Sequence, residues 1–193
     1  MQVIGTVGLP GSGKGEAANV AAEHDIPVVT MGDVIREECR ERGLDPAKHH
    51  GEIAQALRDE EGLDAIAARS LPRIEAALSE TDTVLVDGIR SGVEVECFEE
   101  AFGEDFTLVS IEAPFELRAE RLGERGRDSS DADVERLRER DERELGFGLD
   151  RAMEKADATI ENAGSLESFR EQVRALFENG VDGLERVQTA EQP

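Results

Sequence analysis

The sequence contains no tryptophan and no tyrosine, and only seven of its 193 residues are phenylalanine. A chain of this length buries a sizeable core, and the scarcity of aromatic rings means that this core must be aliphatic. No apolar run approaches the about 18 residues of a membrane-spanning helix, so we expect no contact with a membrane. The N-terminus has no basic segment followed by an apolar stretch, and we therefore expect no signal peptide.

Cysteine and lysine are scarce as well. Cys39 and Cys97 lack the spacing of a metal site, which is typical of a reduced, cytoplasmic protein. Only three of the 22 basic residues are lysines, and with 45 acidic residues the formal net charge is −23. The acids are spread over the whole chain, which indicates adaptation to a high-salt cytoplasm where ions screen self-repulsion; an acidic protein of ordinary salinity is the alternative. This charge argues against nucleic-acid binding, which needs a basic face.

One stretch has the spacing of a site with known chemistry. It follows the apolar run at residues 3–7, has the pattern G-x-x-x-x-G-K of a phosphate-binding loop, and consists of Gly8, Leu9, Pro10, Gly11, Ser12, Gly13, Lys14 and Gly15. Glycines let the backbone turn tightly, so that consecutive N–H groups point at one phosphate. The helix that follows adds the positive end of its dipole, and Lys14 brings a full charge to the outer phosphates. The loop therefore predicts nucleotide binding.

The position after Lys14 departs from the usual form of this loop. A serine or threonine normally stands there, and its hydroxyl ligates Mg²⁺. Here Gly15 and Glu16 follow, so we expect the metal to be held by water, by phosphates and by another side chain. Asp87 ends an apolar strand and is the expected support for Mg²⁺, acting through water. The alternative is that Asp87 only caps a turn.

The pattern of short apolar runs separated by helical segments predicts an α/β fold. Five strands are expected, at residues 2–7, 26–29, 83–87, 106–111 and 157–160. Strands that alternate with helices form a mostly parallel sheet covered on both faces, and ligands bind at the carboxyl ends of such strands. That edge is expected to collect the phosphate-binding loop and the side chains after the second and third strands, namely Asp33, Arg36, Asp87 and Arg90.

Arginines gather between residues 118 and 151. Arg136, Arg140 and Arg143 share one face of a predicted helix that follows a polar turn at 126–130. A hinged flap carrying arginines suits phosphoryl transfer, because the charge on the transferring group must be neutralised and water excluded. The alternative is a solvent-exposed helix face with alternating salt bridges.

Three further predictions concern helices and loops. His49 and His50 are expected in a solvated loop, because adjacent histidines point to different faces. A helix is expected at residues 52–60. Another is expected at residues 64–79, interrupted at Pro72.

Several segments resemble those of adenylate kinase. The phosphate-binding loop is similar, and residues 31–36, M-G-D-V-I-R, resemble a T-G-D-x-x-R segment whose arginine, here Arg36, contacts the acceptor phosphate. Residues 86–90, V-D-G-I-R, resemble a D-G-F-P-R segment but are one residue shorter and lack the proline. Residues 159–166 resemble the loop that packs around adenine in adenylate and dephospho-coenzyme A kinases, which places Asn162 beside the nucleotide.

On these motifs the chain is identified as a member of an archaeal group of adenylate-kinase-related P-loop proteins. The resemblance implies a three-layer P-loop NTPase fold with a five-stranded parallel sheet of order 2-3-1-4-5. It also implies a single kinase domain over residues 1–180, with an acceptor-binding insert at about 33–70 and a short lid at about 118–147. Residues 181–193 are expected to form a flexible tail.

The leading functional hypothesis is an ATP- and Mg²⁺-dependent phosphotransferase acting on a small phosphate acceptor, such as a nucleoside monophosphate. Lys14 and the loop, from Gly8 to Glu16, would bind the donor; Arg36 and Arg90 would orient the acceptor; and the three lid arginines would close over the reaction. Two alternatives are open: a dephospho-coenzyme A kinase with Asp33 as the base, and an ATP-binding switch or slow ATPase. A monomer or small homo-oligomer is expected.

Overall fold

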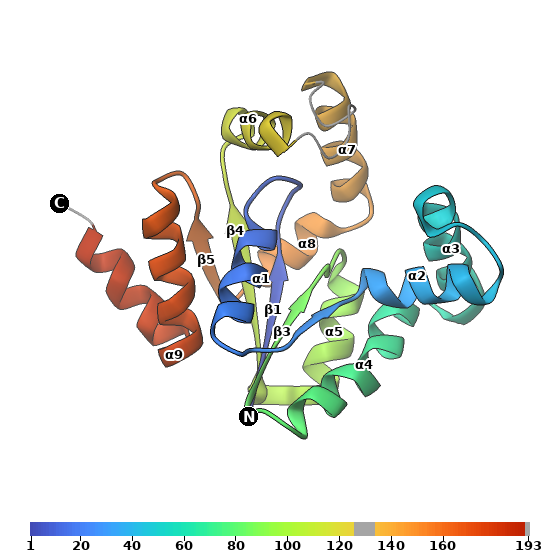
Figure 1. The fold of residues 1–193 in the computed structure, drawn as a ribbon, viewed down its shortest axis with the longest axis horizontal. Coiled ribbons are helices and arrows are strands. Elements are labelled where there is room, and N and C mark those ends of the chain that lie inside the picture. Colours follow the sequence, from blue (N-terminus) through green and yellow to red (C-terminus); the bar gives the residue numbers. More distant parts are fainter. Residues whose placement is uncertain (126–133, 192–193) are drawn as a thin grey trace.

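The computed structural model describes residues 1–125 and 134–191, which form a sheet flanked by helices (Figure 1). The sheet has five strands in the order β2-β3-β1-β4-β5, and every neighbouring pair is parallel. The strands are β1 (Gln2–Val7), β2 (Val28–Thr30), β3 (Thr83–Asp87), β4 (Phe106–Glu112) and β5 (Ala158–Glu161). The predicted fold class and strand order are therefore confirmed.

Successive residues of the central strands pack on opposite faces of the sheet, as the pleat requires. Val3 of β1 belongs to one apolar cluster, whereas its neighbour Ile4 belongs to the other. Val84 and Leu85 of β3 divide in the same way. Because both faces are covered, these strands are continuous apolar runs rather than alternating ones.

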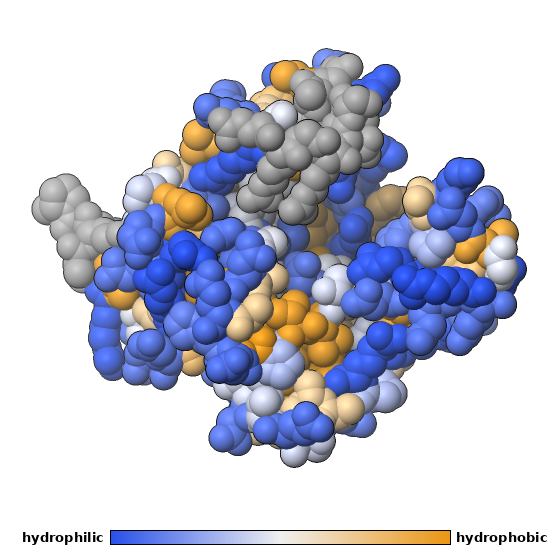
Figure 2. Space-filling view, viewed as in Figure 1, coloured by the Kyte–Doolittle hydropathy of each residue, from blue (hydrophilic) through white to orange (hydrophobic). Residues whose placement is uncertain are grey.

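Helices form the two outer layers. One face of the sheet is covered by helices that contribute Val20 and Phe169 to its apolar cluster, namely α1 (Lys14–Glu23) and α9 (Leu166–Glu191). The other face is covered by helices that contribute Ile74, Phe98 and Leu149, namely α4 (Ala65–Leu78), α5 (Gly92–Phe102) and α8 (Leu149–Glu154). A short 3-10 turn, η1 (Gly103–Asp105), leads into β4. Hydrophilic residues cover most of the molecular face seen in Figure 2, in keeping with the acidic composition.

Two helical pairs stand off the body of the sheet on different sides (Figure 1). The first is α2 (Gly32–Glu41) with α3 (Pro46–Glu61), which occupy the predicted insert. The second is α6 (Phe115–Arg125) with α7 (Val134–Gly146), which occupy the predicted lid. The polar turn predicted at 126–130 lies outside the described residues.

Three local predictions are wrong. Helix α3 begins at Pro46 and includes His49 and His50, so these residues are not in a loop. Helix α4 continues through Pro72, because burial of Ile66, Ser70 and Ile74 along one face outweighs the one hydrogen bond that a proline removes.

The third error concerns the predicted flexible tail. Residues after Gly180, where the backbone turns to a φ of 65°, continue as helix to Glu191. This segment buries Leu184 completely against the cluster between α1 and α9. Among the described helices, none combines the length and the hydropathy needed to cross a bilayer.

Candidate functional site

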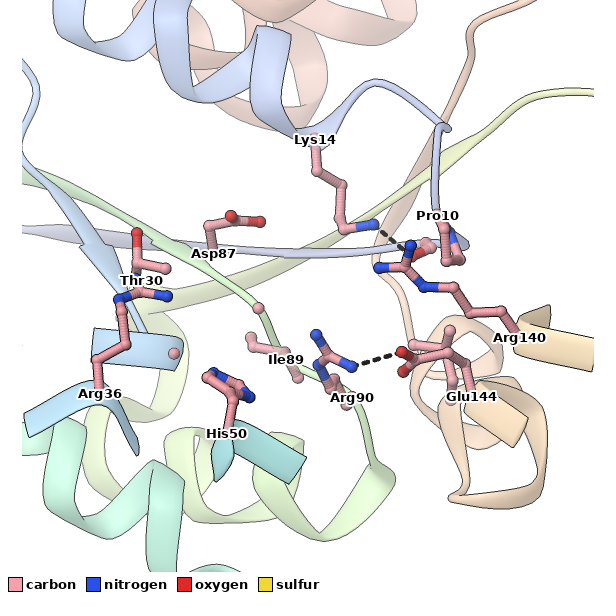
Figure 3. A pocket seen from close by; sticks show the side chains of 14 residues that line it. Pro10, Lys14, Thr30, Arg36, His50, Asp87, Ile89, Arg90, Arg140 and Glu144 are labelled. Atoms are coloured by element: carbon pink, nitrogen blue, oxygen red, sulfur yellow. Dashed lines mark hydrogen bonds and ion pairs between the residues drawn. The ribbon is translucent and has the colours of Figure 1, made fainter. Parts of the chain in front are cut away.

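A cavity of about 230 Å³ lies where the carboxyl ends of β1, β2 and β3 meet (Figure 3). Its wall includes Lys14 from the phosphate-binding loop, Arg36 from α2, Asp87 at the end of β3, and Arg90 just after it. Side chains from three helices complete the wall, namely His50 from α3, Arg140 and Glu144 from α7, and Leu149 from α8. The topology therefore brings six separate segments of the chain, from the phosphate-binding loop to α8, to one volume.

Two glycines of the loop are required by close contacts. A Cβ on Gly8, where φ is +145°, would lie 2.2 Å from the backbone oxygen of Ile111. A Cβ on Gly13, where φ is +124°, would lie 2.3 Å from Nδ2 of Asn162. Both distances are far inside van der Waals contact, so only glycine lets the loop lie against β4 and the segment after β5.

Lys14 reaches back over the loop that carries it. Its Nζ donates hydrogen bonds to the carbonyl oxygens of Gly8, at 2.5 Å, and Leu9, at 3.2 Å. The pKa of Lys14 is lowered to about 8, mainly because the side chain is buried; Asp87 opposes this shift and Arg90 contributes to it. The charge of Lys14 is thus only partly compensated by the protein, and a bound anion would stabilise it.

Asn162 ties the loop to the end of β5. Its Nδ2 donates to the carbonyl oxygen of Ser12 at 2.8 Å, and Arg121 of α6 donates to both the backbone and side-chain oxygens of Asn162, at 3.0 and 3.2 Å. Ser12 Oγ and Arg121 Nη1 are buried without a hydrogen-bond partner among the described residues. A buried donor left unpaired is costly, so these two atoms fit a polar ligand at the loop.

Glu16 points away from the cavity and has a structural partner. Its carboxylate lies 2.9 Å from Nε of Arg170 on α9 and accepts a hydrogen bond from Asn19 at 3.0 Å. Glu16 therefore joins α1 to α9 and is not among the residues that line the cavity. The expectation that it contacts the nucleotide is not met by this geometry.

Asp87 is the carboxylate drawn beside Lys14 (Figure 3). Its Oδ1 lies 3.4 Å from the hydroxyl of Thr6 on the neighbouring strand. Within the described part of the chain, no three His, Cys, Asp or Glu side chains are grouped to hold a metal ion by themselves. A divalent cation here would depend on phosphate oxygens and water in addition to Asp87.

Two arginines and a histidine form the side of the cavity opposite Lys14 (Figure 3). Asp33 holds Arg36 by accepting hydrogen bonds from Nε and Nη2, at 2.9 and 2.6 Å, and does not itself line the cavity. Arg90 donates from Nη1 to Glu144 of the lid at 2.5 Å. Asp33 is therefore a positioning residue rather than part of the wall.

His50 is a site residue that sequence reasoning missed. Burial lowers its pKa below the usual value, and Arg90 and Arg36 lower it further, so the imidazole is neutral at pH 7. The sequence does contain a signal for the helix that carries His50, because Asp45 is a typical capping residue and Pro46 is typical of a first helical position. In the structure Asp45 caps α3 by accepting a hydrogen bond from the backbone N–H of Ala47 at 3.0 Å.

The three predicted lid arginines do not converge on the cavity. Arg140 lines it, whereas Arg143 lines a second cavity and Arg136 lines neither. The physical reason is that a helix advances by about 5.4 Å along its axis per turn. Arginines on one face of α7 therefore lie at different positions along the helix axis, and they reach different cavities.

Arg118 of α6, an arginine that was not among the predicted site residues, links α7 to the phosphate-binding loop. It is buried and forms a bidentate pair with Asp141 of α7, at 3.0 and 2.7 Å. The same guanidinium donates to the carbonyl oxygen of Pro10 at 3.1 Å and to that of Ala113 at 3.2 Å. Arg118 thus fixes the loop backbone relative to α7.

Comparison with known proteins agrees with this geometry. Residues 7–138 match the family described as AAA domain. A UPF0200 protein of Halobacterium salinarum is 62% identical over 92% of this chain and 93% of its own length. A UPF0200/UPF0201 protein of Archaeoglobus fulgidus is 51% identical over 92% of this chain and 55% of its own.

Two solved structures share the fold at low sequence identity. TT1252 from Thermus thermophilus superposes with a TM-score of 0.62 at 20% identity, covering 91% of this chain and 96% of its own. Dephospho-CoA kinase from Campylobacter jejuni superposes with a TM-score of 0.63 at 15% identity, covering 95% and 99%. These likenesses concern the fold alone.

Proposed function

The chain belongs to the UPF0200 family and matches the AAA domain family over residues 7–138, and from this premise we propose that it is an ATP-dependent phosphotransferase. It moves the γ-phosphoryl group to a small phosphate acceptor such as a nucleoside monophosphate. The observation that carries the proposal is the arrangement of cations: Lys14 faces Arg36 and Arg90 across one cavity. Donor and acceptor phosphates would meet in that space.

The loop fits the polyphosphate of ATP. Lys14 gains a counter-charge, and the unpaired Ser12 Oγ and Arg121 Nη1 gain acceptors. The fold supports Mg²⁺ as the companion ion, with Asp87 holding it through water. Bound Mg²⁺ neutralises charge on the β- and γ-phosphates. Asn162 borders the loop where the resemblance to adenine-binding segments places the base.

The acceptor side supports positioning rather than proton transfer. A phosphate acceptor is already ionised at neutral pH, so no general base is needed, and catalysis rests on alignment and electrostatics. Arg36, oriented by Asp33, and Arg90 would bind the acceptor phosphate. Arg140, on the same wall as Lys14, would stabilise the transferring group.

The test is a coupled assay for ADP formation in molar KCl with AMP, CMP, UMP, dephospho-coenzyme A or no acceptor. We expect ADP formation to require one of the phosphate acceptors, and Lys14→Ala to abolish it. The control is Arg186→Gln, on the far helix α9 and outside the cavity, which should turn over normally. ADP formation at the same rate with every acceptor and with none would refute the kinase proposal and favour a slow ATPase.

Dephospho-coenzyme A kinase activity is the second candidate, because one solved structure of similar fold carries that name. It requires a base near an acceptor hydroxyl, and Asp33 was the expected base. In the structure Asp33 is engaged by Arg36 and stands outside the cavity wall. This position favours a phosphate acceptor, and we expect dephospho-coenzyme A to be the poorer substrate in the same assay.

A further inference from the structure

A second cavity of about 510 Å³ adjoins the first. The two share His50 and Arg90 in their walls, so they are neighbours across these side chains. The second cavity lies between α3 of the insert, the start of α5, and the end of α7. The first cavity, at about 230 Å³, is smaller than the about 300–1,000 Å³ that is typical of ligand sites. A bound acceptor would therefore extend into the second.

The charge of the second cavity is opposite to that of the chain. Its eleven lining residues include three arginines, Arg58, Arg90 and Arg143, and neither aspartate nor glutamate. The whole chain has 45 acidic and 22 basic residues, so a lining of this kind is unexpected from composition. Ser91 also lines it and caps α5, whose positive end faces this side. The cavity is suited to an anion.

Glu94, behind the wall, offsets part of this positive charge. It is buried, lies 3.2 Å from Nη2 of Arg58, and accepts from the backbone N–H of Arg90 at 2.8 Å. Glu94 therefore fixes Arg58 and the chain at Arg90 while staying out of the lining. Arg143, whose Nε donates to the carbonyl oxygen of Glu139 on its own helix, is the arginine that the lid contributes.

The same wall is also apolar. Leu63, Val93 and Phe147 are exposed by 62, 37 and 63%, and they are three of the seven large hydrophobic side chains exposed in the described part of the chain. Exposed apolar side chains grouped around a cavity mark a binding site. The ring of Phe147, at the end of α7, provides a flat face for stacking.

From these observations we propose that the second cavity binds the body of the acceptor, and that this body combines a flat apolar part with an anionic group of its own. The ligand class is a nucleotide-like compound with a second phosphate besides the one that accepts. The inference rests on the proposed function, whose cavity binds the accepting phosphate. Phe147 contacts the flat part, and Arg143 the additional anion.

The experiment measures equilibrium binding by calorimetry to the full chain, with the donor site saturated by a non-hydrolysable ATP analogue. The probes are ribose 5-phosphate, AMP and adenosine 3′,5′-bisphosphate. We expect affinity to rise about three- to tenfold from the first to the second, from ring stacking. We expect a further rise of about tenfold to the third, from a charge-assisted contact.

Two variants assign each step. Phe147→Ala should remove the gain of AMP over ribose 5-phosphate, while Leu145→Ala, an exposed apolar residue on the same helix end and outside both cavities, should not. Arg143→Gln should remove the gain of the bisphosphate over AMP, while Arg186→Gln on α9 should not.

Equal affinities for the three probes would overturn the inference. So would a variant that weakens ribose 5-phosphate as much as the larger probes, because the residue would then act on the shared phosphate or on the fold. Phosphoryl transfer is measured separately, in the assay for ADP formation. If the affinities increase in the expected order but no ADP forms, the proposed kinase activity is refuted and the proposed binding site is still supported.

Discussion

The lowered pKa of Lys14 should make the proposed ATP binding dependent on pH between about 7 and 9. Burial is the main cause of the shift to about 8, with Arg90 adding to it and Asp87 opposing it. The polyphosphate of ATP is largely ionised above pH 7 and favours the charged lysine. Binding should therefore raise the pKa of Lys14 and take up a proton wherever the free protein has lost it.

The size of the effect follows from the pKa. A group with a pKa of about 8 is about nine-tenths protonated at pH 7 and about one-tenth protonated at pH 9. If only the charged form binds ATP, the apparent dissociation constant rises about tenfold over this range, equivalent to about 1.4 kcal/mol. Proton uptake on binding rises from about 0.1 to about 0.9 per ATP.

Calorimetry in two buffers of different ionisation enthalpy measures both quantities at each pH. Lys14→Arg is the matched variant, because a guanidinium stays charged throughout and should abolish the proton uptake and flatten the pH dependence. It also controls for Cys97, because burial raises the pKa of that thiol above its usual value. An unchanged affinity with no proton uptake at pH 9 would refute the reasoning.

Three further perturbations test other parts of the structure. Arg118→Ala leaves Asp141 buried without its partner, and unfolding in denaturant should show a loss of about 3–5 kcal/mol; a loss below about 1 kcal/mol, the scale of a surface pair, would contradict the assigned burial. Glu144→Gln removes the carboxylate that Arg90 contacts and should lower the KM for the acceptor by up to about fivefold. The kcat of the variant is measured for comparison, and a higher KM would mean that Glu144 assists acceptor binding. Raising KCl from 0.1 M to 2 M should raise the melting temperature by screening the charge of −23, and a flat response would argue against salt adaptation.

The parts of the fold that were predictable are those encoded by local pattern. The glycine spacing at residues 8–15 and the apolar runs of β1, β3 and β4 each carry their signal within a few residues. The strand order came from resemblance to a family, because periodicity identifies strands but not their neighbours. The continuation of α9 past Gly180 was missed because its apolar residues are sparse, although Leu184 alone buries completely.

The site was less predictable because its contacts join distant parts of the chain. Arg118 and Asp141 are 23 residues apart, and Arg118 reaches Pro10 across 108 residues. Helical spacing indicated which arginines lie on one face of a helix. It does not predict whether those arginines contact a phosphate, a carboxylate or a backbone carbonyl. His50 was missed for a simpler reason. Asp45 as the cap of α3 was not used to predict where the helix begins, so His50 was assigned to a loop and the orientation of its side chain could not be predicted.

The unusual residues after Lys14 have different explanations. Glu16 is held by Arg170, so its carboxylate serves the contact between α1 and α9 rather than the phosphates. No structural contact explains the glycine at position 15, since a Cβ on Gly15 would meet nothing within 4 Å among the described atoms. Packing therefore does not exclude a serine or threonine at this position, and the structure gives no reason for the glycine. In the proposed function Asp87, at the end of β3 and beside Lys14, is the side chain that would support Mg²⁺ through water.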